Sequence, residues 1–590
     1  MKLSLVFAPI AASVVALTTP AAHAATFTVT KTADTADGVC DADCSLREAV
    51  VASNVDDLAD TILVPAGTYV FSIAGADEDA GATGDLDITG PVTVTGAGAA
   101  TTVVNANGID RVFHVRSDLA RVVFEGLTVR GGTAPGSGAA GYGGGVYGFR
   151  SVVDAYNCVF TANSAVRGGA VYIEAQGAEP YVTALHLSGS TITANTAVTS
   201  GGGVGLFAAT ARISHSTLTN NIATGNGGAI DTGLFSQVEI VDSVLTNNEA
   251  GQGGGVYENQ SGAAGLVSFR DSTIANNRAG GKGGGVFADS ANTVFEASRV
   301  RDNQDSVSAC CFNGAGISAE YGTLQIMDTE VTGNTGADSG GGASIFFQTV
   351  TIQGSTISGN SADKYGGGLS ITFGAVTIEN STISGNSVAS AVGDNGVKGG
   401  GGIGWNRFGR SVTTLTNVTV ADNTSGTEGE QLSCSACGAD YPITLRNTVV
   451  AGSGTLDNCL GVIASEGGNL STDVSCGFDD PSDQESVADV KLAALAANGG
   501  PTDTRALQTG SPAIGAAVPA NCPAVDQRGF QRDGMCDSGA FEANVSVDNF
   551  GCGEDLNGLR GQLRYVVEEV LGVPTVGDIL YCLGGLAGAA

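Results

Sequence analysis

The phrase Ser355-Thr356-Ile357-Ser358-Gly359-Asn360 returns as Ser381-Thr382-Ile383-Ser384-Gly385-Asn386, and this repeat decides the fold. A glycine run and an aliphatic residue follow each copy, at Gly366-Gly367-Gly368-Leu369 and Gly400-Gly401-Gly402-Ile403. The asparagine that closes the phrase recurs along the chain at Asn163, Asn195, Asn221, Asn248, Asn277, Asn303, Asn334, Asn360, Asn386 and Asn423. The steps of 26 to 37 residues between them are typical of stacked-repeat proteins.

Each repeat contains three short runs in which apolar and polar residues alternate. In one repeat these are Leu369-Ser370-Ile371, Ala375-Val376-Thr377-Ile378 and Thr382-Ile383-Ser384. Alternation with a period of two residues indicates a half-buried strand. Three strands per repeat, with no room for a helix, predict one coil of a parallel β-helix, and the coils stack at about 4.8 Å.

The repeated asparagines and glycines have structural roles in such a coil. An asparagine at one corner of every coil passes amide hydrogen bonds from coil to coil, as in stacked asparagine ladders. It also tolerates the left-handed backbone that a corner requires. Glycine allows the chain to turn sharply where a side chain would not fit.

The net charge of −33 limits the partners of this 590-residue chain. Only 14% of the residues are charged, with 59 acidic against 26 basic side chains. Binding to nucleic acid needs clustered Lys and Arg, so this balance argues against nucleic acid and against anionic membranes. It is compatible with Ca²⁺ binding or with simple solvation.

The chain begins like an exported protein. Lys2, the apolar run Leu3 to Leu17, and Ala22-His23-Ala24 match the parts of a secretory signal peptide over residues 1–24. The apolar run is short for a membrane span, and no later stretch is long and apolar enough to be one. We therefore expect a mature chain without a transmembrane segment, located outside the cell or on its outer surface.

Cysteine usage agrees with export, because exported chains favour disulfides. Twelve of the 13 cysteines fall into close groups, which we expect to be disulfides: Cys40 with Cys44, Cys310 with Cys311, Cys434 with Cys437, Cys459 with Cys476, Cys522 with Cys536, and Cys552 with Cys582. Sequence alone does not prove this connectivity. Cys158 occupies the place of a repeat serine, and we expect it to be buried and unpaired.

A capping helix is predicted near the mature N-terminus. Ser45 is a suitable helix N-cap, and Glu48 three residues later completes a capping box. The helix would cover the first coil, whose open edge would otherwise pair with another chain.

The motif Cys44-Ser45-Leu46-Arg47-Glu48-Ala49 resembles the signature of bacterial CSLREA-domain proteins. That resemblance implies a secreted, right-handed parallel β-helix in which Arg47 and Glu48 belong to the cap over residues 25–60.

In the coils, predicted for residues 61–476, Phe160-Thr161-Ala162-Asn163-Ser164-Ala165 is followed by Gly168-Gly169-Ala170-Val171. This pattern resembles the repeats of chlamydial polymorphic outer-membrane proteins, which are adhesins, and the resemblance is limited to the coils.

Residues 477–543 differ from the coils. Asn498-Gly499-Gly500-Pro501-Thr502, Asp526-Gln527-Arg528-Gly529-Phe530 and Cys536-Asp537-Ser538-Gly539-Ala540 resemble the "choice-of-anchor Q" region. We expect a disulfide-stapled C-terminal cap in which Arg528 pairs with a carboxylate. Residues 544–590 loosely repeat the N-terminal pattern and are interpreted as a second, degenerate cap.

Five carboxylates and one tryptophan are the candidate site residues. The carboxylates follow glycine runs on separate repeats: Glu174, Asp231, Glu258, Asp289 and Glu320. Stacked carboxylates bind Ca²⁺ or supply the acid and base of a glycosidase. Solvated strand ends are the other interpretation, because the offsets vary. Trp405, the only tryptophan, would stack on a sugar if exposed and pack in the core if buried.

These sequence features are compatible with two alternative functions. The regular repeat favours a non-catalytic cell-surface or extracellular protein, adhesin-like, that binds polysaccharide or cell-surface glycans. The alternative is a secreted polysaccharide lyase or glycoside hydrolase of the pectate-lyase type. No cofactor other than Ca²⁺ is suggested, and His114, His186 and His215 have no metal-binding spacing.

Overall fold

A computed structural model describes residues 23–75, 78–116, 121–175, 183–260, 265–306, 313–336, 338–389, 399–405, 411–426, 428–434, 441–452 and 456–543. Most of the expected signal peptide and the whole of residues 544–590 lie outside these ranges, so those interpretations stay predictions. Five of the predicted disulfide cysteines also lie outside them: Cys310, Cys311, Cys437, Cys552 and Cys582.

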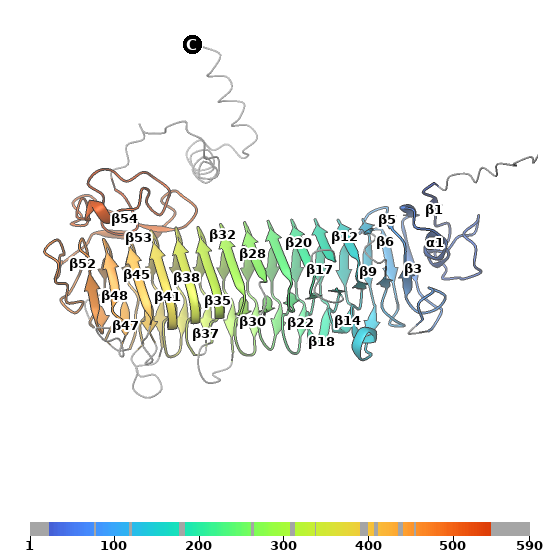
Figure 1. Ribbon diagram of the computed structural model, residues 1–590, viewed down its shortest axis with the longest axis horizontal. Helices are drawn as coiled ribbons and strands as arrows, with labels where there is room; N and C mark the ends of the chain where they lie inside the picture. Colours follow the sequence, from blue (N-terminus) through green and yellow to red (C-terminus); the bar gives the residue numbers. More distant parts are fainter. Residues whose placement is uncertain are drawn as a thin grey trace, which may run out of the picture.

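The described chain is a parallel β-helix, as the repeat predicts. Figure 1 shows the strands stacked along one long axis, with the N-terminal coils at one end and the C-terminal coils at the other. Three sheets of 27, 15 and 10 strands, here called sheets A, B and C, form the stack. Sheets A and B extend along nearly all of it, and sheet C covers residues 133 to 388. Neighbouring strands within them pair in parallel, coil to coil.

Sheet A has two rows of strands joined by a bend. The first row comprises β4 (Leu86–Ile88), β7 (Phe113–Val115), β11 (Val146–Phe149), β15 (Val171–Glu174), β19 (Val204–Phe207), β23 (Ile230–Thr232), β27 (Val256–Asn259), β31 (Val286–Asp289), β44 (Ile403–Trp405), β47 (Leu432–Cys434) and β50 (Cys459–Leu460). The second row comprises β1 (Thr26–Thr28), β2 (Asp60–Val64), β5 (Val92–Gly96), β8 (Arg121–Glu125), β12 (Val152–Tyr156), β16 (Ala184–Ser188), β20 (Thr210–Ser214), β24 (Gln237–Val241), β28 (Leu266–Arg270), β32 (Asn292–Glu296), β45 (Val412–Thr416), β48 (Ile443–Arg446) and β51 (Ile463–Ser465). Three long strands run through both rows: β35 (Ile317–Met327), β38 (Ala343–Gln353) and β41 (Leu369–Glu379).

Sheets B and C complete each coil. Sheet B comprises β3 (Gly67–Val70), β6 (Thr102–Asn105), β9 (Thr128–Arg130), β13 (Val159–Thr161), β17 (Thr191–Thr193), β21 (Thr217–Thr219), β25 (Val244–Thr246), β29 (Thr273–Ala275), β33 (Arg299–Arg301), β36 (Glu330–Thr332), β39 (Thr356–Ser358), β42 (Thr382–Ser384), β46 (Thr419–Ala421), β49 (Val449–Ala451) and β52 (Leu470–Ser471). Sheet C comprises β10 (Thr133–Ala134), β14 (Ser164–Arg167), β18 (Thr196–Ser200), β22 (Ile222–Ala223), β26 (Glu249–Ala250), β30 (Arg278–Ala279), β34 (Gln304–Asp305), β37 (Thr335–Gly336), β40 (Ser361–Ala362) and β43 (Ser387–Val388). Short 3-10 turns lie at Gly138–Gly141 and Pro519–Asn521.

The asparagine ladder runs without a break from Asn163 to Asn423. The Nδ2 of each ladder asparagine donates to the Oδ1 of the next, from Asn163 to Asn423, at 2.9–3.0 Å. After Asn423 the side chain of Gln431 takes the next place, with its Oε1 accepting from Nδ2 at 2.8 Å. Because each amide is buried and bonded on both sides, the ladder fixes the register of successive coils.

A second ladder uses hydroxyl groups at the corner that precedes sheet B. The backbone N–H of each corner residue donates to the hydroxyl of its counterpart in the next coil, as from Ser190 to Ser216 Oγ and from Ser216 to Ser243 Oγ. Cys158 replaces the serine in this row, and its N–H donates to Ser190 Oγ at 3.1 Å. Its thiol is buried and unpaired, as expected.

The N-terminal helix α1 (Leu46–Ser53) carries the predicted capping box. Burial disfavours the charged form of Glu48, but hydrogen bonds from the Ser45 N–H, the Thr35 hydroxyl and the Asp37 N–H lower its pKa to about 2. The expected place of Glu48 in the cap is thus confirmed, and so is the helix itself.

Arg47 ties this helix to the loop that precedes β4. Its side chain is fully buried and pairs with Asp34 at 2.7 Å. The guanidinium also donates to the carbonyl oxygens of Gly81, Gly84 and Asp85 at 2.8–3.0 Å. Arg47 therefore fixes the loop over residues 81–85 against the cap.

Residues 490–543 lie along the side of the C-terminal coils. They include two antiparallel strands, β53 (Leu492–Ala496) and β54 (Thr504–Leu507), which lie over the coils in Figure 1. The buried Gln527 exchanges hydrogen bonds with Thr356 and Thr382 on sheet B, at 2.9 and 2.6 Å. Arg528 pairs with Asp526 at 2.7 Å, which is the structural role expected for it.

Three predicted disulfides are present among the described residues: Cys40–Cys44, Cys459–Cys476 and Cys522–Cys536. Cys434 is also disulfide-bonded.

Among the described residues, we find no helix with the length and apolar character needed to span a membrane.

Candidate functional site

The strand registers distribute the five candidate carboxylates over three columns of sheet A. Glu174 aligns with Phe207 on the next coil, whereas Asp231 aligns with Tyr257. Asp289 and Glu320 are the pair that align with each other on adjacent coils. The variable offsets seen in the sequence therefore place these side chains at different points on the coil.

Each of the outward carboxylates already has a local partner. Glu174 accepts from the Tyr147 hydroxyl at 2.9 Å, and burial raises its pKa. Burial also raises the pKa of Asp231 to about 6, although a hydrogen bond with the Ser200 side chain acts in the opposite direction. Glu320 pairs with Lys282, and Asp289 accepts from the Ser290 hydroxyl at 3.1 Å.

Glu258 points into the core and not toward solvent. Its side chain is fully buried in the inward column that also holds Thr232 and Ala288, and Thr293 Oγ1 donates to it at 2.9 Å. Burial raises its pKa well above the ordinary value. As a correction to the sequence-based expectation, Glu258 is not placed to touch a polymer at the surface.

This burial predicts that Glu258 makes stability depend on pH. In the unfolded state the Glu258 carboxyl releases its proton above a pKa near 4.5, whereas in the folded state it keeps the proton to a higher pH. The contribution of Glu258 to stability is therefore full below pH 4.5 and is lost as the pH rises toward the pKa of the folded state. Glu258→Gln removes this loss, so the variant should exceed the wild type in stability at neutral pH, by up to about 1.4 kcal/mol for each pH unit above the unfolded pKa.

Urea denaturation at a series of pH values from 4 to about 8 measures this difference. Glu249→Gln, on an exposed carboxylate of β26, is the matched control. Parallel curves for the wild type and Glu258→Gln would contradict the assignment.

Trp405 also belongs to the core. Its side chain is 1% exposed, and its indole N–H donates to Thr413 Oγ1 at 3.1 Å. Of the two interpretations given to it, packing in the core is the one confirmed. Stacking of Trp405 on a sugar is excluded by this burial.

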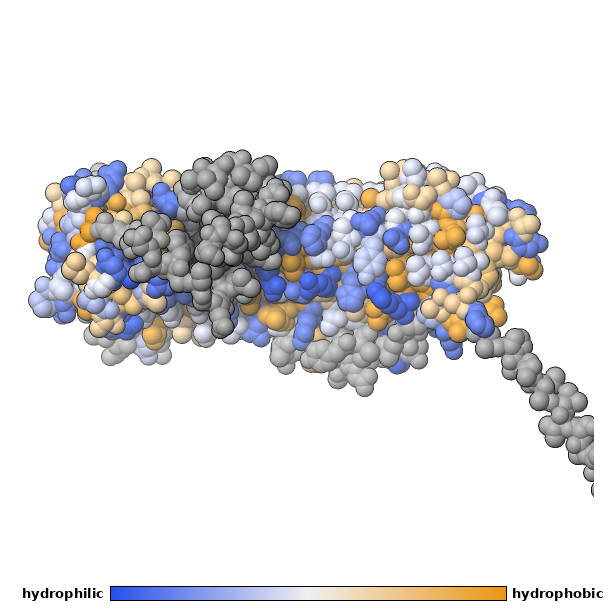
Figure 2. All heavy atoms as spheres, turned by 90° about the horizontal axis from the view of Figure 1, so that it is seen from above, coloured by the Kyte–Doolittle hydropathy of each residue, from blue (hydrophilic) through white to orange (hydrophobic). Residues whose placement is uncertain are grey.

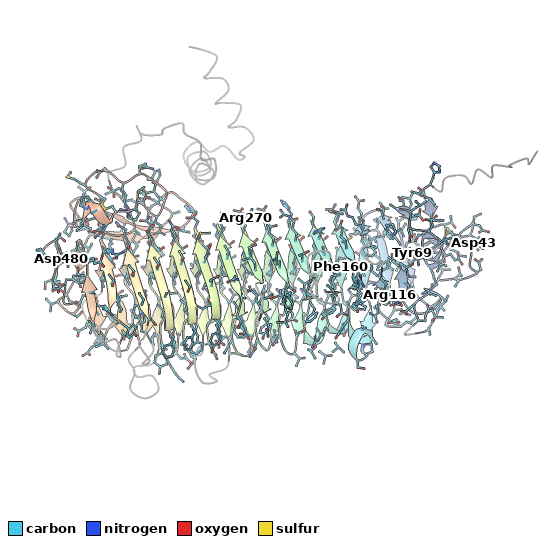
Figure 3. All side chains as sticks on the ribbon, in the orientation of Figure 1. Asp43, Tyr69, Arg116, Phe160, Arg270 and Asp480 are labelled. Carbon is cyan, nitrogen blue, oxygen red and sulfur yellow. A yellow bond between two sulfur atoms is a disulfide. The ribbon has the colours of Figure 1, made fainter. Side chains whose placement is uncertain are left out.

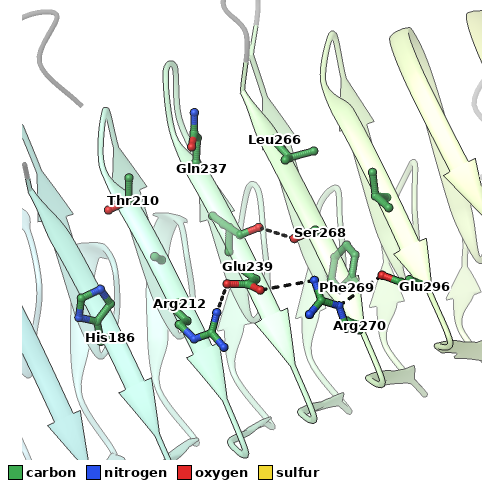
Figure 4. A pocket seen from close by; sticks show the side chains of 13 residues that line it. His186, Thr210, Arg212, Gln237, Glu239, Leu266, Ser268, Phe269, Arg270 and Glu296 are labelled. Atoms are coloured by element: carbon green, nitrogen blue, oxygen red, sulfur yellow. Dashed lines mark hydrogen bonds and ion pairs between the residues drawn. The ribbon is translucent and has the colours of Figure 1, made fainter. Parts of the chain in front are cut away.

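A shallow trough of about 530 Å³ crosses the second row of sheet A, over β16, β20, β24, β28 and β32. Figure 4 shows its charged side chains on one face, joined by ion pairs. Glu239 pairs with Arg212 and with Arg270, and Arg270 also pairs with Glu296. Leu266, 41% exposed, adds an apolar surface to the trough.

One end of the trough carries a histidine oriented by a buried carboxylate. Asp154 Oδ1 lies 2.7 Å from His186 Nδ1, and the Asp154 side chain is fully buried. Arg121 pairs with the other Asp154 oxygen. Hydrogen bonds and charge from His186 and Arg121 outweigh the effect of burial and lower the pKa of Asp154. The carboxylate thus stays charged, and His186, 43% exposed, lines this end of the trough.

Three aromatic rings stack at the bend of sheet A on successive coils, and we call Tyr321, Phe347 and Phe373 the aromatic ladder. Ring centroids lie 5.6 Å apart between Tyr321 and Phe347 and 4.5 Å apart between Phe347 and Phe373, with interplanar angles of 8° and 15°. Tyr321 and Phe347 are each 47% exposed. All three residues have φ between 52° and 54°, a left-handed conformation that is costly for bulky side chains.

The trough and the aromatic ladder were not predicted from the sequence. The ladder residues occupy a break between two alternating runs, where the pattern carries no strand signal. The charged side chains of the trough come from neighbouring strands that lie a full repeat apart in sequence, so no local motif brings them together. A scan of equivalent repeat positions for aromatic residues would have found the ladder.

The space-filling view agrees with a mixed polar surface. Figure 2 shows hydrophilic and hydrophobic residues interspersed over the visible face, without one large apolar area.

Comparisons with known proteins add the following. No family model matches the chain, and no curated protein matches it. The solved structures that it resembles include the pectate lyase Pel9A, at 15% identity and a TM-score of 0.23, covering 89% of this chain and 97% of that one. The A-module of the mannuronan C-5 epimerase AlgE4 from Azotobacter vinelandii matches at 14% identity and a TM-score of 0.26, covering 73% and 94%.

A mannuronic acid-specific polysaccharide family 6 lyase from human gut microbiota matches at 10% identity and a TM-score of 0.25, covering 67% of this chain and 86% of that one. Because no family model matches, the resemblance to CSLREA-domain and choice-of-anchor Q proteins rests on the sequence motifs alone.

Proposed function

We propose that this protein is an extracellular, non-catalytic polysaccharide-binding protein that holds an extended neutral glycan along the outward face of sheet A. The aromatic ladder carries this proposal. The described disulfides support an extracellular location, because disulfides persist in oxidising compartments.

The aromatic ladder has the form of a sugar-stacking surface. Aromatic rings offer a flat apolar face and a large contact area, which suits the C–H faces of a pyranose ring. Holding three bulky residues in the left-handed region costs free energy, of order 1–3 kcal/mol each. The same corner is also left-handed at Arg150, Ala208 and Ser290 on other coils, so this backbone conformation belongs to the corner. What favours a binding role is the alignment of three partly exposed aromatic rings on successive coils.

The spacing of the coils suits a polymer that runs along the axis of the β-helix. Successive rings lie on successive coils, which are separated by about 4.8 Å, a distance of the same order as the length of one pyranose unit. The trough extends this face toward the N-terminal coils through Leu266 and the charged pairs.

The charge balance of the trough favours a neutral glycan. The guanidinium groups of Arg212 and Arg270 are paired with the carboxylates of Glu239 and Glu296. A neutral sugar can donate to the carboxylates and accept from the guanidinium groups without breaking these pairs. An acidic polymer would have to compete with them and would also meet the net charge of −33.

Affinity electrophoresis of the mature protein tests the proposal. Gels containing neutral polysaccharides (a β-glucan, a xylan and a galactomannan) are compared with gels containing polygalacturonate or alginate. We expect retardation by at least one neutral polymer and none by the acidic ones. Retardation only by acidic polymers, or by none of the panel, would overturn the proposal.

A second function, polysaccharide lyase, is favoured by the Asp154–His186 pair. In β-elimination, the free ring nitrogen of His186 would take the C5 proton of a uronate, and a guanidinium would stabilise the carboxylate as negative charge develops on it. The C4–O4 bond then breaks, the proton passes to the leaving oxygen, and a C4–C5 double bond remains. Ultraviolet absorbance of such unsaturated ends, lost in His186→Ala, would establish this function and displace the first.

A further inference from the structure

A second cluster lies on the first row of sheet A, away from the trough. His114 on β7 is in register with Asp87 on β4, and its Nδ1 lies 3.0 Å from Asp87 Oδ1. Asp79, on the loop before β4, places its Oδ1 3.8 Å from the same nitrogen. The three atoms, one from each side chain, lie within 4.8 Å of one another. Figure 3 places Arg116, which pairs with Asp79, near the N-terminal end of the stack and well separated from Arg270 in the trough.

We propose that Asp79, Asp87 and His114 bind a divalent metal ion of the zinc class. Imidazole nitrogen and carboxylate oxygen are ligands that Zn²⁺ accepts, and three protein ligands leave a fourth position for water. Ligands at about 2.0–2.1 Å in a tetrahedral site lie about 3.4 Å from one another. The spacings of 3.0 and 3.8 Å about the His114 nitrogen lie on either side of that value.

Surrounding contacts orient all three ligands. The Gly81 N–H donates to Asp87 Oδ2 at 2.8 Å, which leaves Oδ1 toward His114. The guanidinium of Arg116 pairs with Asp79 Oδ2 at 2.5 Å, so the other oxygen of that carboxylate, Oδ1, remains for the His114 side. The ring of His114 stacks on Tyr147, with centroids 5.0 Å apart and planes at 12°. Such outer contacts are typical of metal sites, where they fix the direction of the ligand atoms.

The N-terminal helix α1 holds the loop that carries Asp79 and Gly81. Gly81, whose N–H holds Asp87, receives a hydrogen bond on its carbonyl oxygen from the buried Arg47 at 2.9 Å. Two ligands are enclosed, since the side chains of Asp87 and His114 are 0% and 13% exposed, whereas Asp79 is 59% exposed. An ion would therefore enter from the Asp79 side and find two ligands already in place.

Cobalt(II) and zinc titrations of the untagged mature protein test this site. We expect one Co²⁺ per chain, with the visible absorption of a tetrahedral centre, displaced by one equivalent of Zn²⁺. His114→Ala should weaken binding at least about 100-fold, and Asp79→Asn about 10-fold or more. His186→Ala is the matched control, because its histidine also pairs with a buried aspartate, and it should bind as the wild type does.

Asp79→Asn changes an exposed side chain, so it keeps the test valid if His114→Ala fails to fold. Zn²⁺ should raise the melting temperature of the wild type and of His186→Ala more than that of Asp79→Asn. Absence of stoichiometric binding, or equal binding by the wild type, His114→Ala and Asp79→Asn, would overturn the proposal. The outcome is independent of any glycan binding.

Discussion

Replacing Asn277 by alanine should lower the free energy of unfolding by about 4 kcal/mol. The Asn277 amide donates to Leu245 O and to Asn303 Oδ1, and its Oδ1 accepts from the N–H and the Nδ2 of Asn248. Alanine leaves the Leu245 carbonyl and two Asn248 donors without these partners inside a fully buried row. Each buried group that loses its partner costs about 1–3 kcal/mol.

Urea or thermal denaturation followed by circular dichroism measures this effect. Asn277→Asp keeps the shape of the side chain but turns an oxygen toward Asn303 Oδ1, and it should be about as destabilising. Thr273→Ala, an outward side chain on β29 of the same coil, is the control and should cost less than about 0.5 kcal/mol. A loss for Asn277→Ala no larger than that of the control would show that the ladder does not hold the coils together.

Removing two of the three rings of the aromatic ladder should weaken glycan binding strongly. In the Tyr321→Ala/Phe347→Ala double variant the dissociation constant for the neutral polysaccharide should rise about 30-fold, because two stacking contacts of about 1 kcal/mol each are lost. Titration of the selected oligosaccharide by calorimetry gives the two constants.

The Phe347→Gly variant distinguishes an effect on glycan affinity from an effect on stability. Glycine adopts positive φ without strain, so this variant should fold with undiminished stability and still bind more weakly. Phe207→Ala is the matched control, since Phe207 is 39% exposed and lies outside the ladder. Equal affinity in the wild type and the double variant would remove the observation on which the proposed function rests.

The fold was predictable because the same pattern of strand, corner and turn residues recurs many times along the chain. From Asn163 to Asn423 the coils share an inward aliphatic residue, a corner asparagine and a glycine turn, so the pattern is recognisable even where a single coil departs from it. The capping box at Ser45 and Glu48 was also predictable, because the residues that cap a helix are close neighbours in sequence. The pairing of Arg528 with Asp526 is likewise a contact between near neighbours.

The candidate sites were less predictable, because they depend on register. Whether a residue faces the core or solvent changes with a shift of one position in a strand. That shift separates Glu258, which is buried, from Asp289 and Glu320, which align on the outward side. The trough and the Asp79–Asp87–His114 cluster bring together residues from different coils or from a loop, and no short motif encodes those distances.

The most direct test of the central claim is a crystal structure of the protein with the neutral oligosaccharide that binds best. We predict a sugar chain along the outward face of sheet A, with pyranose rings parallel to the exposed rings of Tyr321 and Phe347. A chain bound on sheet B or sheet C, with the aromatic ladder unoccupied, would contradict the account.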